Sequence, residues 1–329
     1  MLGIGILGCG RIGQVHARSL SRLRGARLVS VADALPDAAA ALATEYGAEA
    51  QSAEALITSS DVEAVVIGTP TTTHYDLIHA AAAAGKAIFC EKPIDLDAAR
   101  VATCIDSVAA AGVPFMTAFQ RRFDPHFKAV ADRLHGGEIG ETELVILTSR
   151  DPGPPPIGYI KTSGGLFRDM MIHDLDMARF LLAEEPVEVF AAGACFVDPG
   201  IAEAGDIDTA AVTLKTASGR ICQINNSRRA TYGYDQRIEV HGSKGMLRAS
   251  NVLENLVERA GASGFEAAPT QNFFLERYEA AYLAEMAYFV EAVSAGTAPQ
   301  PSAEDGRRAQ LLADAATASY TSGVPVKLD

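Results

Sequence analysis

The stretch Ile4-Gly5-Ile6-Leu7-Gly8-Cys9-Gly10-Arg11-Ile12-Gly13 opens the chain with a short apolar strand and a glycine-rich turn. A helical pattern of apolar residues follows, carried by Val15, Ala17 and Leu20. Residues 28–32 (Leu-Val-Ser-Val-Ala) then read as a second strand, and Asp33 stands at its end. This order of strand, glycine turn, helix, strand and acid predicts a dinucleotide-binding βαβ unit.

Each position of the glycine turn has a physical role. Gly8 permits the tight turn, Gly10 lets the backbone approach a pyrophosphate, and Gly13 lets helix and strand pack closely. Arg11 and Ile12 begin the helix, whose N-terminus offers unpaired N–H groups and the positive end of a dipole. We therefore expect residues 8–13 to hold the phosphates of the cofactor.

Asp33 indicates which dinucleotide is bound. It lies 20 residues past Gly13, where a carboxylate can accept both ribose hydroxyls. It would repel a 2′-phosphate, and the next residues, Ala34 and Leu35, offer no guanidinium to receive one. NAD is therefore expected rather than NADP. The alternative, a glycine turn in an α/β domain that binds nothing, leaves Asp33 as a coincidence.

The whole chain excludes several classes of protein. Its 329 residues predict two domains, and its net charge of −13 without a long basic run argues against nucleic acid and anionic membranes as partners. The cysteines are odd in number and form no CxxC pair, which favours reduced thiols in the cytoplasm over a zinc site. No signal peptide is expected, and no apolar run approaches the ~20 residues of a membrane span.

The pattern of expected secondary structure changes near residue 120. Up to residue 118, strands and helices alternate, which predicts a parallel sheet. Beyond it, strands follow one another through turns such as Ser218-Gly219 and Gly242-Ser243, which predicts a large, open, mainly antiparallel sheet. We expect an α/β protein with domains at 1–118 and 119–329. Helices are expected at about 165–183, 275–295 and 303–320, and the last of them can pack back on the first domain.

One predicted helix carries a cluster of titratable side chains. Asp169, His173 and Asp176 have the spacing i, i+4 and i+7, which places them on one helix face. A histidine between two carboxylates is a candidate general base, because a carboxylate fixes its tautomer and stabilises the imidazolium. The alternative is a helix start with acids for its dipole and a surface histidine. A metal site would need further ligands, and none is evident.

A second candidate site follows the strand at residues 87–90. Ligands of parallel sheets lie beyond the carboxyl ends of the strands, so Glu91, Lys92 and Pro93 are placed near the nicotinamide. The Lys92 ammonium could stabilise a developing alkoxide, although most lysines are simply solvated. The Lys92–Pro93 bond is a candidate cis peptide.

Residues that follow two other strands are also expected near the bound ligands, because they too lie beyond the carboxyl ends of parallel strands. Thr69, Pro70 and His74 follow the strand at 62–68 and are candidate cofactor contacts, with a helix-start role as the alternative for His74. Gln120 and Arg122 follow the strand at 114–118 and are candidate substrate contacts.

Together, three motifs resemble the Gfo/Idh/MocA oxidoreductase family over the whole chain. They are Gly8–Gly13, Glu91-Lys92-Pro93 and Asp169-Met-Met-Ile-His173-Asp-Leu-Asp176. Within that family, further stretches favour the members that oxidise inositols: Gln120-Arg-Arg-Phe-Asp124, Ser149-Arg-Asp-Pro152 and Gly164-Gly-Leu-Phe-Arg-Asp169. The resemblance implies a Rossmann domain joined to an α/β domain whose open sheet packs face to face in dimers and tetramers.

The resemblance also implies roles for individual residues. Lys92, Asp169 and His173 match the catalytic residues of the family, and Arg122, Asp176 and Tyr234 would line the substrate pocket. The expected reaction is NAD-dependent oxidation of one ring hydroxyl of a cyclic polyol, with myo-inositol as the first candidate substrate. Two alternatives stay open: another sugar or anhydrosugar dehydrogenase of the family, and a catalytically silent dinucleotide sensor. The intact catalytic triplet argues against the sensor.

Overall fold

The computed structural model describes residues 1–328, which form two compact units. The first comprises Met1–Asp124 and Ala280–Gln310, and the second comprises Pro125–Glu279 and the chain from Leu311 onward. The division falls within α11 (Glu279–Ser294) and α12 (Ala303–Ser322). The first unit therefore includes a segment that the sequence analysis assigned to the second domain.

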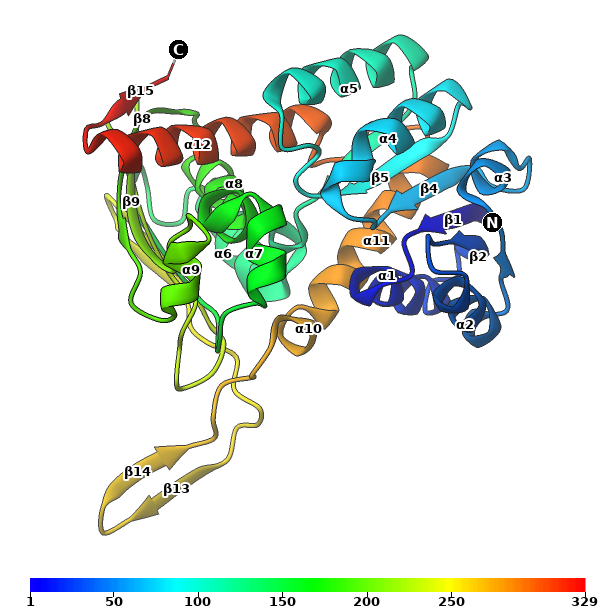
Figure 1. Ribbon diagram of the computed structural model, residues 1–329. Coiled ribbons are helices and arrows are strands. Elements are labelled where there is room, and N and C mark those ends of the chain that lie inside the picture. Colours follow the sequence, from blue (N-terminus) through cyan, green and yellow to red (C-terminus); the bar gives the residue numbers. More distant parts are fainter. Residues whose placement is uncertain (329) are drawn as a thin grey trace. The chain divides into compact units, whose positions relative to one another are not determined.

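The first unit is built on a six-stranded sheet in the order β3-β2-β1-β4-β5-β6, and every pair of neighbours is parallel. Figure 1 labels β1, β2, β4 and β5 of this sheet. The parallel order confirms the predicted Rossmann fold. Its strands are β1 (Leu2–Leu7), β2 (Ala26–Ala32), β3 (Glu49–Ala50), β4 (Ala64–Ile67), β5 (Ala87–Glu91) and β6 (Phe115–Ala118). Its helices, besides α11 and the start of α12, are α1 (Arg11–Ser21), α2 (Pro36–Tyr46), α3 (Ala53–Thr58), α4 (His74–Ala83) and α5 (Ala98–Ala111).

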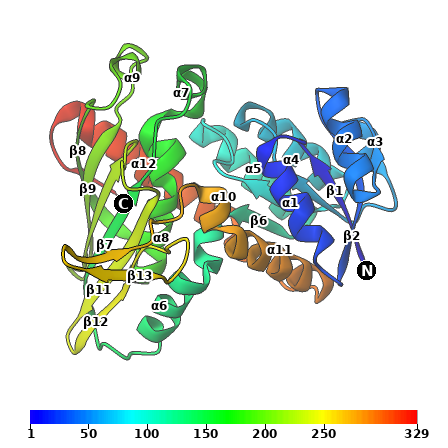
Figure 2. The same ribbon diagram turned by 90° about the horizontal axis from the view of Figure 1, so that it is seen from below.

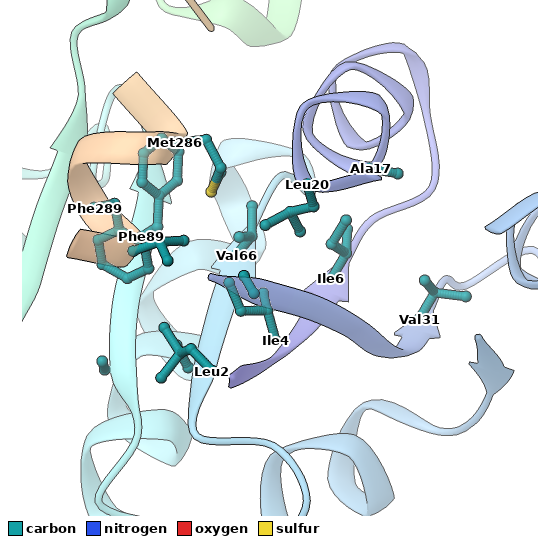
Figure 3. Close-up of a cluster of buried hydrophobic side chains, with 14 of the residues drawn as sticks. Leu2, Ile4, Ile6, Ala17, Leu20, Val31, Val66, Phe89, Met286 and Phe289 are labelled. Atoms are coloured by element: carbon teal, nitrogen blue, oxygen red, sulfur yellow. The ribbon is translucent and has the colours of Figure 1, made fainter. Parts of the chain in front are cut away.

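Apolar side chains cover both faces of this sheet, as parallel strands require. On one face, side chains of β1 and β5 pack against α1 and α11, and Figure 3 shows Phe89 beside Met286 and Phe289. On the other face, α3, α4 and α5 supply a second cluster that includes Ile78 and Val101. Burying one large apolar side chain is worth about 1.5–3 kcal/mol, so these clusters fix the strands whose carboxyl ends carry the candidate site.

The second unit contains a seven-stranded sheet in the order β12-β11-β7-β10-β9-β8-β15. Neighbouring strands are antiparallel except for the pair β7 and β10, which confirms a mainly antiparallel sheet. The turns expected at Ser218-Gly219 and Gly242-Ser243 close the hairpins β9–β10 and β11–β12. The strands are β7 (Thr142–Arg150), β8 (Pro186–Ala194), β9 (Thr209–Thr216), β10 (Ile221–Ser227), β11 (Asp235–Gly242), β12 (Gly245–Ala249) and β15 (Val326–Lys327).

Helices of the second unit pack on one face of this sheet. Figure 2 shows α8 (Ile172–Leu182) beside β7 and α6 (Pro125–His135) beside β12. Two shorter helices are α7 (Ile157–Ser163) and α9 (Pro199–Glu203). A separate hairpin of β13 (Glu258–Gly261) and β14 (Gly264–Ala267) extends away from the sheet (Figure 1).

Two predicted helices are interrupted. The helix expected at 165–183 consists of a π-helical segment, Phe167–Met171, followed by α8. The helix expected at 275–295 consists of α10 (Phe274–Arg277) and α11, with Tyr278 between them. Within residues 1–328, no helix combines the length and the apolar character that crossing a lipid bilayer would require.

Candidate active site: a dinucleotide turn, a lysine turn and a carboxylate–histidine helix

The glycine turn joins β1 to α1 with the backbone geometry that a dinucleotide needs. Gly8 has a φ of +98°, in the region that side chains disfavour. A Cβ on Gly13 would lie 1.9 Å from the Gly8 carbonyl oxygen, so only glycine allows this close packing. A Cβ on Gly10 would meet no atom within 4 Å, so space is open where a pyrophosphate would approach. No described side chain caps α1 at Gly10, which leaves its first N–H groups for an anion.

Asp33 is held at the end of β2 by backbone donors. The Cys9 N–H donates to one carboxylate oxygen at 2.6 Å, and the Leu35 N–H donates to the other at 2.8 Å. Each oxygen keeps acceptor capacity, because an ionised carboxylate offers about four lone-pair sites. The turn and the acid thus fit the phosphates and the ribose of NAD, respectively.

Cys9 lies inside the turn but is not a nucleophile. Burial and then the nearby Asp33 carboxylate raise the pKa of the Cys9 thiol to about 11. The thiol is therefore protonated at neutral pH.

The candidate cofactor residues Thr69 and Pro70 lie in the loop after β4, and His74 is the first residue of α4. His74 is 1% exposed, and its ring nitrogens lie 2.9 Å from the carbonyl oxygens of Pro93 and Thr69. Burial lowers the pKa of His74, which favours the neutral ring. A neutral ring has a single N–H and donates to only one of these two carbonyl oxygens, while its other nitrogen lies beside the second.

The turn with Lys92 directly follows β5. Glu91 is the last residue of that strand, and His16 of α1 donates to its carboxylate at 2.8 Å. Lys92 is half-buried, and the Lys92–Pro93 bond is cis. The sequence does not reveal this pair, because 75 residues separate His16 from Glu91 and no local pattern connects them.

Asp169 lies in the π-helical segment before α8. Its carboxylate accepts a hydrogen bond from the Tyr159 hydroxyl at 2.8 Å and one from the Arg228 guanidinium at 3.4 Å. A π-helical turn contains about one residue more than an α-helical turn, so residues four apart still lie near one face, and the grouping of Asp169 with His173 stays a prediction. Sequence reasoning missed Tyr159 and Arg228, which reach Asp169 from α7 and from the chain after β10.

His173 and Asp176 lie on α8 at different depths. His173 is half-buried, whereas Asp176 is 1% exposed and lies 3.6 Å from Arg179. Between them, Asp174 faces the sheet and accepts hydrogen bonds from Ser149 at 2.5 Å and Asn226 at 3.0 Å. These bonds connect α8 to β7 and β10 and fix the rotation of the helix.

The remaining predicted substrate residues lie in two places. In the first unit, the Gln120 amide lies 3.4 Å from the Tyr282 hydroxyl, and Arg122 pairs with Asp305 at 3.0 Å. In the second unit, Tyr234 is 7% exposed and packs against Tyr278. None of these contacts tests a role in substrate binding. Residues 1–328 contain no group of three or more His, Cys, Asp or Glu side chains placed to hold a metal ion.

A Rossmann sheet with this turn and Asp33 defines an NAD-binding protein, and the Lys92 and His173 segments suit a dehydrogenase. The family comparison agrees. Residues 2–119 match the model described as oxidoreductase family, NAD-binding Rossmann fold, and residues 127–248 match the GFO/IDH/MocA C-terminal domain. The chain therefore belongs to the GFO/IDH/MocA oxidoreductase family, and its cofactor is NAD.

Several relatives are similar to the chain over nearly their full length. An inositol 2-dehydrogenase of Rhizobium meliloti is 55% identical over 96% of both chains. A myo-inositol 2-dehydrogenase of Thermotoga maritima is 44% identical over 99% of this chain and 98% of the relative. The crystal structure of a scyllo-inositol dehydrogenase from Lactobacillus casei, with bound NAD(H) and scyllo-inositol, has a TM-score of 0.93 at 30% identity and 99% coverage of both chains.

Proposed function

We propose that this chain is an NAD-dependent dehydrogenase that oxidises one ring hydroxyl of an inositol to a ketone, with myo-inositol oxidised at C2 as the first candidate. The observation that carries the proposal is the similarity to inositol dehydrogenases at up to 55% identity across 96% of the chain. That span covers most of both units, so it is not restricted to the cofactor-binding fold. The intact glycine turn, Asp33, Lys92 and His173 support the same reaction.

The proposed mechanism separates a hydride from a proton. NAD, when bound, supplies the acceptor for the hydride that leaves the carbinol carbon. His173 accepts the proton of the substrate hydroxyl, and Asp169 orients the imidazole and stabilises its charged form. Lys92 donates a hydrogen bond to the same oxygen while negative charge develops on it. The products are a ketone, NADH and a proton.

We propose a division of roles along the chain. Residues 1–118 bind the cofactor, and residues 119–329 bind the substrate and form the oligomer. The proposed cofactor contacts are Gly8, Gly10, Arg11, Ile12, Gly13, Asp33, Thr69, Pro70, His74 and Glu91. The proposed substrate contacts are Lys92, Gln120, Arg122, Asp176 and Tyr234.

We also propose that the protein is a cytoplasmic homotetramer, with a dimer as the simpler assembly. Phe190, Ile221 and Met246 lie on the same face of the seven-stranded sheet by strand register, and each is at least 37% exposed. The β13–β14 hairpin exposes 82% of Phe265, and an isolated two-stranded hairpin is only marginally stable in water. All five cysteines are free thiols, which suits a reducing compartment. A monomer in light scattering at micromolar concentration would contradict the assembly.

The function is tested by measuring NADH formation with a panel of myo-inositol, scyllo-inositol, other polyols and aldoses. Turnover of an inositol is expected, with NAD preferred over NADP because of Asp33. Turnover of an aldose or anhydrosugar alone would favour the other dehydrogenases of the family. Binding of NAD without turnover of any compound would favour a dinucleotide sensor. A preference for NADP would contradict the role assigned to Asp33.

A further inference from the structure

Two buried histidines of the first unit contact the residues on either side of Lys92. His16 comes from α1, and its Nε2 donates to the Glu91 carboxylate at 2.8 Å. His74 comes from α4, and its Nδ1 lies 2.9 Å from the Pro93 carbonyl oxygen. The two helices thus hold the residue before Lys92 and the residue after it.

Each ring is fixed by further neighbours. The His16 ring packs edge-on against Phe89, with 5.0 Å between the ring centroids. Its Nδ1 has no hydrogen-bond partner within residues 1–328, so Glu91 is the polar group that orients it. The second nitrogen of His74 lies 2.9 Å from the Thr69 carbonyl oxygen, which connects two neighbouring strand ends of the sheet.

Packing alone does not explain these side chains. His16 and His74 are 0% and 1% exposed, respectively, and each faces the interior from a helix where an aliphatic side chain could also fill the space. A buried polar group costs about 1–3 kcal/mol when it is left unsatisfied. One nitrogen of each ring contacts a residue next to Lys92, so we explain the two rings by their effect on the lysine turn.

We propose that His16 and His74 are positioning residues that fix the direction of the Lys92 ammonium. The proposal rests on the catalytic role proposed for Lys92. Anchoring the Glu91 side chain and the Pro93 carbonyl restricts the backbone on both sides of Lys92, so the ammonium is held in place before substrate arrives. Catalysis is sensitive to such placement, because an error of about 1 Å can cost on the order of 10²-fold in rate.

The position of each ring nitrogen allows a crossed rescue experiment. An asparagine amide can place a donor near the position of Nδ1, and a glutamine amide can place one near Nε2. We expect H74L and H16L to lower kcat, measured at saturating NAD, by roughly 10- to 100-fold. The KM for NAD is expected to rise as well, because His74 and Glu91 are also proposed cofactor contacts, so the loss of kcat is the decisive measurement. H74N and H16Q should restore much of the lost kcat, whereas H74Q and H16N should not. His79→Leu, on the same helix as His74, is the matched control and should keep wild-type kcat.

A double-mutant cycle separates positioning from a general loss of structure. If His74 acts through Lys92, H74L should cause no further loss of kcat in a K92A background. Additive losses, or equal kcat in the Asn and Gln variants at both positions, would overturn the proposal. If H16L fails to fold, the His74 series decides the question alone.

A measurement that does not depend on turnover tests this proposal separately from the proposed function. In the protein without NAD, the rate at which an amine-specific acylating reagent modifies Lys92 is followed by mass spectrometry. H74L and H16L should change this rate, whereas H79L should not, and an unchanged rate would overturn the proposal. Retention of wild-type turnover by K92A would instead refute the catalytic role of Lys92, while the modification rate would still report on the turn.

Discussion

The glycine turn and the Asp169 helix are built in opposite ways. The turn needs only residues 8–13 and Asp33, and backbone N–H groups hold its acid. The Asp169–His173 segment depends on side chains that arrive from α7, β7 and β10, including Tyr159, Ser149 and Asn226. A backbone site is therefore encoded within one short stretch, whereas a side-chain site is assembled from distant ones.

The glycine turn offers the largest expected effect. Ala at Gly13 places a Cβ 1.9 Å from a backbone oxygen, so G13A should lose about 3 kcal/mol or more of folding free energy. Ala at Gly10 meets no atom of the protein within 4 Å, so G10A should keep wild-type stability and lose NAD affinity. Urea unfolding and NAD titration measure both effects. Unchanged NAD binding by G10A would contradict the assignment of the pyrophosphate to this turn.

Substitutions of the catalytic side chains should lower turnover and leave NAD affinity nearly unchanged. K92A and H173A should lower kcat on the order of 10²-fold, because each removes proton transfer or charge stabilisation in the transition state. NAD affinity should stay nearly intact, since the glycine turn is unaffected. Steady-state kinetics with inositol and calorimetric NAD titration test this. If H173A kept most of its turnover, the general base would have to be another residue, with Lys92 the first candidate.

A third prediction concerns stability in the second unit, where the buried Asp208 organises the loop before it. Burial alone would raise the pKa of Asp208, but hydrogen bonds from the Phe196 and Val197 N–H groups, the Cys195 thiol and the Thr209 hydroxyl lower it to about 2. Because the pKa is lower in the folded state, Asp208 stabilises the fold above about pH 4 and loses this effect as pH falls toward 2.

D208N should therefore cost about 2 kcal/mol at pH 7, and the difference from wild type should shrink between about pH 4 and pH 2. Urea unfolding at several pH values measures it. The exposed Glu203, at the end of α9 between Phe196 and Asp208, provides the control E203Q, which should be neutral. A pH-independent cost of D208N would contradict the assigned pKa.

The smallest expected effect is on the pH dependence of oxidation. The rate should rise with pH, because only a neutral His173 can accept the proton. D169N should move this rise to lower pH, since a lost carboxylate no longer stabilises the imidazolium. Arg228 lies 3.4 Å from Asp169 and already offsets part of its charge, so we expect a shift of less than about one pH unit. A shift to higher pH would contradict the assigned role of Asp169.

The sequence predicted the parts of the molecule that depend on local patterns. The Rossmann strands, the antiparallel hairpins and the acid at the end of β2 follow from periodicity and turn residues. The π-helical segment at Phe167–Met171 was not predictable, because apolar spacing over five residues does not separate a π turn from an α turn. The β13–β14 hairpin was missed because every residue of both strands is exposed, so no alternation marks it.

Side-chain partners were predicted least well. His16 and Glu91, Asp169 and Arg228, and Asp174 and Asn226 are each more than 50 residues apart. Only the packing of helices on their sheets brings such pairs together. The sequence around each residue alone does not predict how the helices pack. The catalytic roles of Lys92, Asp169 and His173 stay predictions.

The position of α11 in the first unit has a consequence for synthesis of the chain. Met286, Phe289 and Val290 complete the core on one face of the Rossmann sheet (Figure 3), yet they follow Asp124 by more than 160 residues. At about 5–20 residues per second, a ribosome needs roughly 10–30 s to make that interval. During this time the apolar surface of the nascent sheet that includes Phe89 lacks the segment that covers it, so the Rossmann core is completed only after most of the chain has been made.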